Sequence, residues 1–381
     1  MKKAIALALA LTMGLSLVAC GSSSSGNSSS SAASTTAASS ESSAANESPA
    51  SSESSAADTA VEDITQGEKL NIKWYAVLPD THPTITPYAE LFDEIAEETN
   101  GRITFTMTAG GVLGTEQEGF DMIRDGTVQG GMMNTSYYES YVPNSQGWMM
   151  PYTFTDYELA LKYFNEVALP DWNEQIESST NTIAVNAVSP GFRCLTCNTA
   201  VYKPEDASGL RIRSMESPMS QSYVSVLGGV PVPLAWAEVY MGLSTGSIAG
   251  QENPIAHIQT YNLFEVQDYL VFTEHAFILS WSIFNADFWN GLSETDRAYL
   301  TEKFTKEAQM SIESVNTYTE DTFGKLESEY GMTVITPENG LDKQAFIDNA
   351  DKFLNENFTA PEYDGWWDFR NAAVEWCEAN S

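Results

Sequence analysis

The sequence predicts an α/β fold of two domains, built on a parallel sheet with crossover helices. Strand-like and helix-like segments alternate along the first part of the folded body, which is the order that such a sheet requires. A chain of 381 residues with 43% hydrophobic side chains is long enough for two domains. A predicted helix over residues 293–326 is too long for one small domain, so we expect it to span both.

The folded body is expected to begin near residue 67, where the composition changes, with a strand over residues 70–78. A helix is predicted over residues 88–99, because apolar side chains recur there at helical spacing: Tyr88, Leu91, Phe92 and Ile95. Asn100 and Gly101 are a typical helix stop. The next predicted elements are a strand (103–107), a loop (110–114), a helix (117–124) and a strand (128–133).

The same alternation resumes later in the chain. The predicted strands are 182–188, 193–196 and 209–213, and the predicted helices are 217–227 and 236–243. The C-terminal third is predicted to be mostly helical. Its long helix has capping residues at 293–296 and contains no Pro or Gly before Gly324.

The charge balance excludes two classes of partner. The chain has 52 Asp plus Glu against 18 Lys plus Arg, a formal charge of −34. A nucleic acid or an anionic membrane surface requires a basic face, which this composition opposes. One or two desolvated Arg side chains can still hold an anion in a pocket. A small anionic ligand is therefore compatible with the composition.

The first twenty residues predict an export signal. Lys2 and Lys3 precede an apolar stretch over 4–18, and the segment ending in Cys20 resembles a bacterial lipobox. This resemblance implies cleavage before Cys20 and attachment of a diacylglyceryl lipid to its sulfur; the alternative is an ordinary signal peptide that contains a Cys. We expect the protein at the outer face of the cytoplasmic membrane or in the periplasm.

A low-complexity segment follows the signal. Residues 21–60 contain 18 Ser and 10 Ala and no aromatic residue, so they cannot bury enough apolar surface to fold. We expect a disordered linker over residues 21–66, with a root-mean-square reach of roughly 35–40 Å.

One block of the body carries a family signature, and its motifs are Gly209-Leu210-Arg211-Ile212-Arg213, Glu216-Ser217-Pro218, Leu227-Gly228-Gly229, Pro231-Val232-Pro233-Leu234, Glu238-Val239-Tyr240 and Gly250-Gln251-Glu252-Asn253-Pro254. With His82-Pro83 and Gly191-Phe192-Arg193, they resemble the solute-binding subunits of tripartite ATP-independent periplasmic (TRAP) transporters, of the DctP type. The resemblance covers the whole body outside the signal and linker.

The resemblance implies a two-lobed, periplasmic-binding-protein-like α/β fold with a hinge and a long helix across both lobes. The expected division is residues 67–190 plus 279–318 for lobe I and 191–278 plus 319–381 for lobe II. Such a protein captures an organic acid between its lobes and delivers it to membrane permease subunits. It is not an enzyme and needs no cofactor.

The resemblance also assigns site residues. Arg213 matches the Arg that forms a bidentate pair with the ligand carboxylate, and planar guanidinium geometry suits that role. Asn253 matches a ligand-bonding position. Arg193 matches a second Arg, for which ligand contact and structural pairing are equally open. Asn134 follows a predicted strand, at the end where parallel sheets present groups to ligands.

Four further side chains are candidates for the pocket. Trp236, Trp281 and Tyr137 could wall it with aromatic faces, although such residues are more often core, and His82 belongs to the matching His-Pro pair. The ligand itself stays open: a C4-dicarboxylate, a sugar acid, a keto acid and an aromatic acid are all compatible.

One other constellation, a pair of cysteines, is weaker. Cys194 and Cys197 have CxxC spacing, but with no second such pair and only three His in the chain, no metal site is expected. Two thiols or a local disulfide without catalytic role are the expectation.

Two other functions are alternatives. Acid pairs such as Glu116 with Glu118, or Glu238 with Glu252, are the only support for a secreted glycoside hydrolase. A solute-binding lipoprotein of an ATP-driven importer or a sensor does not explain the block over residues 250–254.

Overall fold

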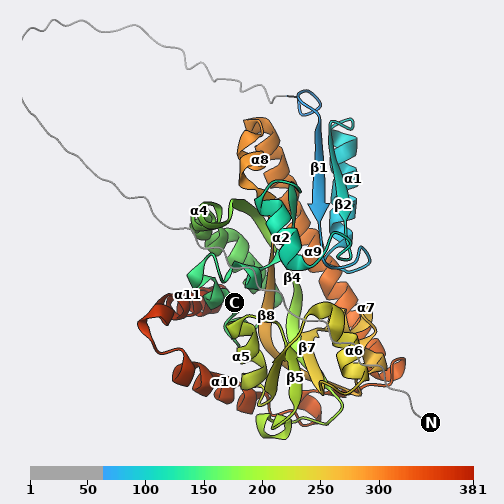
Figure 1. Ribbon diagram of the computed structural model, residues 1–381, viewed down its shortest axis with the longest axis vertical. Coiled ribbons are helices and arrows are strands. Elements are labelled where there is room, and N and C mark those ends of the chain that lie inside the picture. Colours follow the sequence, from blue (N-terminus) through green and yellow to red (C-terminus); the bar gives the residue numbers. More distant parts are fainter. Residues whose placement is uncertain (1–62) are drawn as a thin grey trace, which may run out of the picture. The chain divides into compact units, whose positions relative to one another are not determined.

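A computed structural model describes residues 63–381 (Figure 1). The expected signal segment, Cys20 and residues 21–62 of the expected linker lie outside these residues. The carbonyl oxygen of Ile64 accepts a hydrogen bond of 2.8 Å from Nε of Arg102. Ile64, a residue of the expected linker, thus makes a defined contact with the folded body.

All the described strands belong to one sheet of nine strands, in the order β2-β1-β3-β8-β4-β7-β5-β6, with β9 paired to β8. Their bounds are β1 Leu70–Tyr75, β2 Ile103–Thr108, β3 Gly130–Asn134, β4 Thr182–Cys197, β5 Arg211–Ser214, β6 Val230–Pro233, β7 Gly250–Pro254, β8 Tyr269–Asn285 and β9 Thr333–Ile335. β1 pairs in parallel with β2 and β3, and β5 in parallel with β6 and β7. Each of these two parallel groups matches the predicted crossover pattern.

The helices are α1 Thr86–Glu98, α2 Glu116–Arg124, α3 Tyr157–Tyr163, α4 Leu169–Thr180, α5 Pro218–Val226, α6 Val239–Ser244, α7 Ile255–Thr260, α8 Ala286–Gly291, α9 Glu294–Ser328, α10 Lys343–Asn357 and α11 Asp364–Asn380. Short 3₁₀ turns include η1 Thr135–Tyr138, η2 Pro143–Met149 and η5 Trp236–Glu238. We call β1, β2 and β3, together with their helices, the β1 half. We call β5, β6 and β7, together with their helices, the β7 half.

Two long antiparallel strands join the halves (Figure 1). The sequence predicts two separate strands where β4 is continuous; a register shift between Val188 and Gly191 lets one strand of 16 residues pass Pro190. β8 is not predicted from the sequence; it pairs with β3 near one end and with β9 near the other. Most of β8 is buried, so it lacks the alternating pattern that marks a half-exposed strand.

The long helix α9 runs along both halves, as predicted, because it packs against α1 and also against α7 and β9 (Figure 1). The side chain of Ser293 caps it by accepting a hydrogen bond of 3.0 Å from the backbone of Asp296. The C-terminal helix α11 packs on α3 and η2, in the β1 half, which differs from the expected division. Within residues 63–381, no helix is both long and apolar enough to cross a membrane.

Aromatic packing fixes the β1 half against α9. The ring of Trp74, fully buried on β1, lies 5.3 Å from Tyr88, 5.4 Å from Phe284 and 5.2 Å from Phe304 between ring centroids. Such offset and edge contacts are favourable beyond the burial of their area. β1, α1, β8 and α9 thus share one core, which holds the strand ends of this half in place.

Candidate functional site

The guanidinium of Arg213 is the centre of the candidate site. β5 carries it, and the side chain is buried at 4% exposure. Its Nε donates to the backbone oxygen of Leu234 at 2.9 Å, and within residues 63–381 no carboxylate lies within 4.0 Å to pair with it. Burial, and then the charge of Arg193, lower the pKa of Arg213 to about 10. It stays cationic at neutral pH and has two terminal nitrogens to offer an anion.

Arg193 is held differently. It is 1% exposed on β4 and forms a buried ion pair with Glu252, donating from Nε to one carboxylate oxygen and from Nη2 to the other at 2.9 Å. Nε2 of His275 lies 3.1 Å from the same carboxylate. Burial alone raises the pKa of Glu252, but the charge of Arg193 and hydrogen bonds from both partners outweigh it and lower that pKa. Arg193 thus has a structural partner in Glu252, while its Nη1 has no hydrogen-bond partner among residues 63–381. Contact of Arg193 with a ligand stays a prediction.

Aromatic rings lie beside Arg213. Its guanidinium carbon is 5.5 Å from the ring centroid of Trp236, a distance typical of a cation–π contact. The ring of Tyr261 lies 4.8 Å from that of Trp236, edge to face, and His257 lies 5.7 Å from it. Trp236, Tyr261 and His257 thus form an aromatic wall beside Arg213, and of these only Trp236 is among the aromatic residues expected from the sequence.

The β1 half contributes three residues to the candidate site. Asn134 ends β3, Tyr137 lies in η1 directly after it, and Glu116 begins α2. Tyr137 interacts electrostatically with Glu116 and with Arg213, so it links the two halves at this point. One oxygen of Glu116 accepts a hydrogen bond of 2.8 Å from the backbone of Asn134. Burial raises the pKa of Glu116 to about 7, so at neutral pH this carboxyl is only partly ionised. The side chain of Asn134 accepts from the backbone of Ser136 at 2.8 Å and caps η1.

His82 lies in the loop between β1 and α1. It is fully buried, and its Nε2 is 3.4 Å from Nδ1 of His257 on α7. The contact brings the β1 half next to the helix that carries the wall member His257.

Asn253 is buried on β7, where the amide nitrogen donates to the side-chain oxygen of Gln251 at 2.6 Å. Gln251 in turn donates to the hydroxyl of Thr196 on β4 at 2.9 Å. This chain of polar groups fixes the orientation of the Asn253 amide beside Glu252.

Trp281 lies in the hydrophobic core. Its side chain is 0% exposed, and its ring contacts are with Trp148 at 5.4 Å and Phe164 at 5.8 Å. The structure thus places Trp281 in the packing of β8 and not with the group around Arg213.

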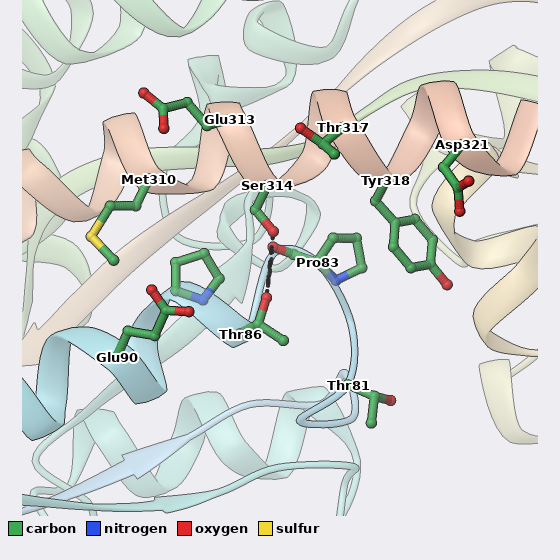
Figure 2. A pocket seen from close by; sticks show the side chains of 11 residues that line it. Thr81, Pro83, Thr86, Glu90, Met310, Glu313, Ser314, Thr317, Tyr318 and Asp321 are labelled. Atoms are coloured by element: carbon green, nitrogen blue, oxygen red, sulfur yellow. Dashed lines mark hydrogen bonds between the residues drawn. The ribbon is translucent and has the colours of Figure 1, made fainter.

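Two hollows lie elsewhere on the described chain. One, of about 540 Å³, lies between the loop before α1 and helix α9 (Figure 2). There Thr86 and Ser314 point toward each other with their hydroxyl oxygens 3.4 Å apart, and Glu90, Glu313 and Asp321 lie around them. The other, of about 800 Å³, lies between α9 and the Thr336–Lys343 region. No basic residue of the described chain lines the first, and Lys343 in the second is paired with Glu274, so we place the site at Arg213.

The CxxC pair gives no second site. Cys194 and Cys197 are free thiols buried in separate core clusters. Burial raises the pKa of both, that of Cys197 to about 11, so neither forms a reactive thiolate at neutral pH. Among residues 63–381, His, Cys, Asp and Glu form no cluster of three or more that could hold a metal ion.

Two halves joined by long strands, with the unpaired guanidinium of Arg213 beside aromatic rings, are typical of a binding protein for a small solute. The comparison with protein families agrees with this class. Residues 75–360 match the model of the bacterial extracellular solute-binding protein family 7, DctP, and the chain belongs to this family. The family consists of substrate-binding transport proteins.

Individual relatives have low sequence identity to this chain, but the matches cover much of its length. The chain is 28% identical over 265 residues to the ectoine-binding periplasmic protein TeaA of Halomonas elongata, covering 69% of this chain and 77% of that protein. It is 28% identical over 267 residues to the 2,3-diketo-L-gulonate-binding periplasmic protein YiaO of Escherichia coli, covering 70% and 80%.

Solved structures show the same fold. A TRAP periplasmic solute-binding protein from Haemophilus influenzae with bound L-gulonate has a TM-score of 0.75 at 22% identity, covering 81% of this chain and all of that chain. One from Ochrobactrum anthropi, whose C-terminus is bound in its ligand pocket, has a TM-score of 0.73 at 26% identity, covering 82% and 97%. These confirm the predicted two-lobed α/β architecture.

Proposed function

We propose that this protein captures a small organic acid at Arg213 and delivers it to the membrane subunits of a TRAP transporter. The observation that carries the proposal is the buried guanidinium of Arg213, which has one backbone hydrogen bond and no acidic partner among the described residues. A charge removed from water in this way is costly unless an anion pairs with it. A ligand carboxylate, accepting two parallel hydrogen bonds, supplies that pair.

The neighbouring groups support a monovalent site. Arg193 is already neutralised by Glu252, so Arg213 carries the uncompensated positive charge of this group. We expect Asn253 and Tyr137 to add polar contacts, and Trp236 offers an aromatic face against the guanidinium. Relatives support the ligand class, because solved TRAP solute-binding proteins hold L-gulonate, L-galactonate and D-erythronate.

The remaining parts of the proposal concern delivery. The lipobox-like segment ending in Cys20 would anchor the protein at the outer face of the membrane, and the Ser- and Ala-rich segment after it would act as a tether. We infer that the two lobes close on the acid at a hinge in the long strands β4 and β8, and that the closed form docks on the permease. The acid leaves unchanged, because the role is transport and not catalysis.

A thermal-shift screen tests the ligand class. We would compare sugar acids, C4-dicarboxylates, keto acids and aromatic acids with neutral sugars and amino acids. A ligand at a hundred times its Kd adds about 2.7 kcal/mol to the free energy of unfolding, which gives a measurable rise in Tm. The expected result is a rise confined to carboxylates, with no product formed.

Arg213→Ala tests the residue. We expect binding of the stabilising acid to weaken by about 2–5 kcal/mol, because the carboxylate then enters a buried site without its partner. Arg211→Ala is the matched control, since Arg211 lies on the same strand but is exposed. Equal binding by Arg213→Ala and the native protein in calorimetry contradicts the assignment. Stabilisation by neutral sugars alone, unaffected by the substitution, favours the rival importer.

A further inference from the structure

Two buried histidines form a hydrogen bond between the halves of the molecule. His82 precedes α1 in the β1 half, and His257 lies on α7 in the β7 half, 175 positions apart in the sequence. Nε2 of His82 lies 3.4 Å from Nδ1 of His257, and the rings meet edge to face at 74°. The loop with His82 is itself held on α9, because Thr86 bonds Ser314 at 3.4 Å (Figure 2).

The neighbouring backbone decides where the protons of this pair lie. The backbone N–H of Thr84 donates to Nδ1 of His82 at 3.2 Å, so this nitrogen is an acceptor and the proton of a neutral His82 is on Nε2. Nε2 therefore donates to Nδ1 of His257, which makes that nitrogen an acceptor as well. The proton of His257 is then on its own Nε2.

Both rings are held in the neutral form. Burial lowers the pKa of His82 to about 3, and burial with the charges of His82, Arg193 and Arg213 lowers the pKa of His257 well below its usual value. A second proton on His82 would lie on Nδ1 and face the backbone N–H of Thr84. A second proton on His257 would lie on Nδ1 and face the N–H of His82. The tautomers are thus set by the fold over the whole neutral range.

His257 belongs to the group around Arg213. Its ring lies 5.7 Å from that of Trp236 and 5.8 Å from that of Tyr261, and it interacts electrostatically with Arg213. The residue is 6% exposed, and within residues 63–381 no hydrogen bond reaches its Nε2. Nε2 is therefore an unused donor in the group that includes Arg213 and Trp236.

We propose that His257 donates a hydrogen bond from Nε2 to an oxygen of the bound acid, and that His82 is a positioning residue that fixes the His257 tautomer from the opposite half. The inference rests on the proposed function, since it assumes an acid at Arg213. It gives the site one charged donor and one neutral donor. It also couples the second donor to closure, because the two halves must meet for His82 to reach His257.

The binding experiment uses L-gulonate, D-galactonate and D-erythronate with the full chain, and calorimetry on the acid that binds most tightly. His257→Phe keeps an aromatic ring but removes the donor, and we expect a loss of affinity of about tenfold to a hundredfold. His257→Gln returns an N–H group near the Nε2 position and should recover part of the loss. His82→Phe should weaken binding less, and adding it to His257→Phe should weaken binding no further.

Thr260→Val is the matched control. Thr260 lies on the same helix and bonds Tyr318 of α9 at 3.4 Å, so this variant removes a hydrogen bond of α7 without touching the His pair. We expect unchanged affinity. Equal losses in Thr260→Val and His257→Phe overturn the inference, because they would show that any loosening of α7 is sufficient.

Nitrogen-15 spectra of the imidazoles test the tautomers without a ligand. We expect both rings to be protonated at Nε2 at pH 7, and the His257 signals of His82→Phe to show a mixture of tautomers. A native His257 protonated at Nδ1, or on both nitrogens, overturns the inference. So does native affinity in His257→Phe while Arg213→Ala abolishes binding; that result leaves the proposed function standing. If no organic acid binds at all, the proposed function falls and the ligand contact falls with it.

Discussion

The buried carboxyl of Glu307 should make the protein less stable as the pH rises. Glu307 lies in the middle of α9 with 0% exposure, and one of its oxygens accepts from the amide of Asn186 at 2.6 Å. No basic side chain pairs with it among the described residues. Burial, opposed by hydrogen bonds from Asn186 and Tyr88, raises the pKa of Glu307 from 4.5 to about 8.

The sign and size of the effect follow from proton linkage. Between pH 4.5 and 8 the folded protein keeps a proton on Glu307 that the unfolded chain has released. Stability therefore falls as pH rises in this window, by about 1.4 kcal/mol per pH unit. Glu307→Gln removes this term and supplies an N–H that can meet the buried side-chain oxygen of Asn186, which has no partner among residues 63–381. From pH 5 to pH 7.5 the gain of the variant over the native protein should grow by about 3 kcal/mol.

Urea unfolding at constant ionic strength and several pH values measures this difference. Glu302→Gln is the matched control, because Glu302 is exposed on the same helix and its replacement leaves the buried carboxyl of Glu307 in place. Taking differences between variant and native protein cancels the titration of every other group. A Glu307→Gln difference that stays flat from pH 5 to pH 7.5 refutes the reasoning.

Two further substitution and labelling results are expected. Gly228→Ala should cost at least about 2 kcal/mol in urea unfolding, because a Cβ there would lie 2.0 Å from the carbonyl oxygen of Pro204 at a φ of +88°. Gly246→Ala, with a φ of +71° but open space, should cost about 1 kcal/mol, and equal costs would contradict the steric argument. In the folded protein at pH 8, iodoacetamide should modify the half-buried Cys377 before the buried Cys194; peptide mass spectrometry that finds Cys194 labelled first contradicts its burial.

Local patterns were enough to predict the elements of the β1 half. The apolar spacing of Tyr88, Leu91 and Ile95 predicts α1, and the hydroxyl of Ser293 predicts the start of α9, because both signals act within one or two helical turns. β8 is not predicted from the sequence because both of its faces are covered. A strand in that position needs no alternation, so its sequence carries no signal of period two.

The site was only partly predictable for a related reason. Arg213 and Trp236 lie near each other in sequence and meet in space, but the partner of Arg193 depends on the pairing of β4 with β7. Glu116 and His257 come from opposite halves, and nothing in the local sequence marks either as a neighbour of Arg213. Contacts between distant segments arise from topology, which single residues do not reveal.

The charges around Arg213 predict a preference among acids. Arg193 and Glu252 cancel, Arg213 carries one positive charge, and Glu116 is near half ionisation at neutral pH. Tyr137 interacts electrostatically with both Arg213 and Glu116, so these three side chains belong to the same group. One ligand carboxylate satisfies Arg213, whereas a second one near Glu116 would meet a partly ionised carboxyl of like charge.

We therefore expect the site to favour a monocarboxylate over a dicarboxylate of equal length. Calorimetry with gluconate and glucarate, which have the same carbon chain, measures the preference. We expect gluconate to bind at least tenfold more tightly, a difference of about 1.4 kcal/mol. Glu116→Gln removes the opposing charge and should narrow the ratio, whereas Glu118→Gln, an exposed neighbour on α2, should leave it unchanged. An equal preference for both acids in the native protein, or a ratio that Glu116→Gln does not alter, would show that Glu116 does not face the ligand and that specificity comes from shape alone.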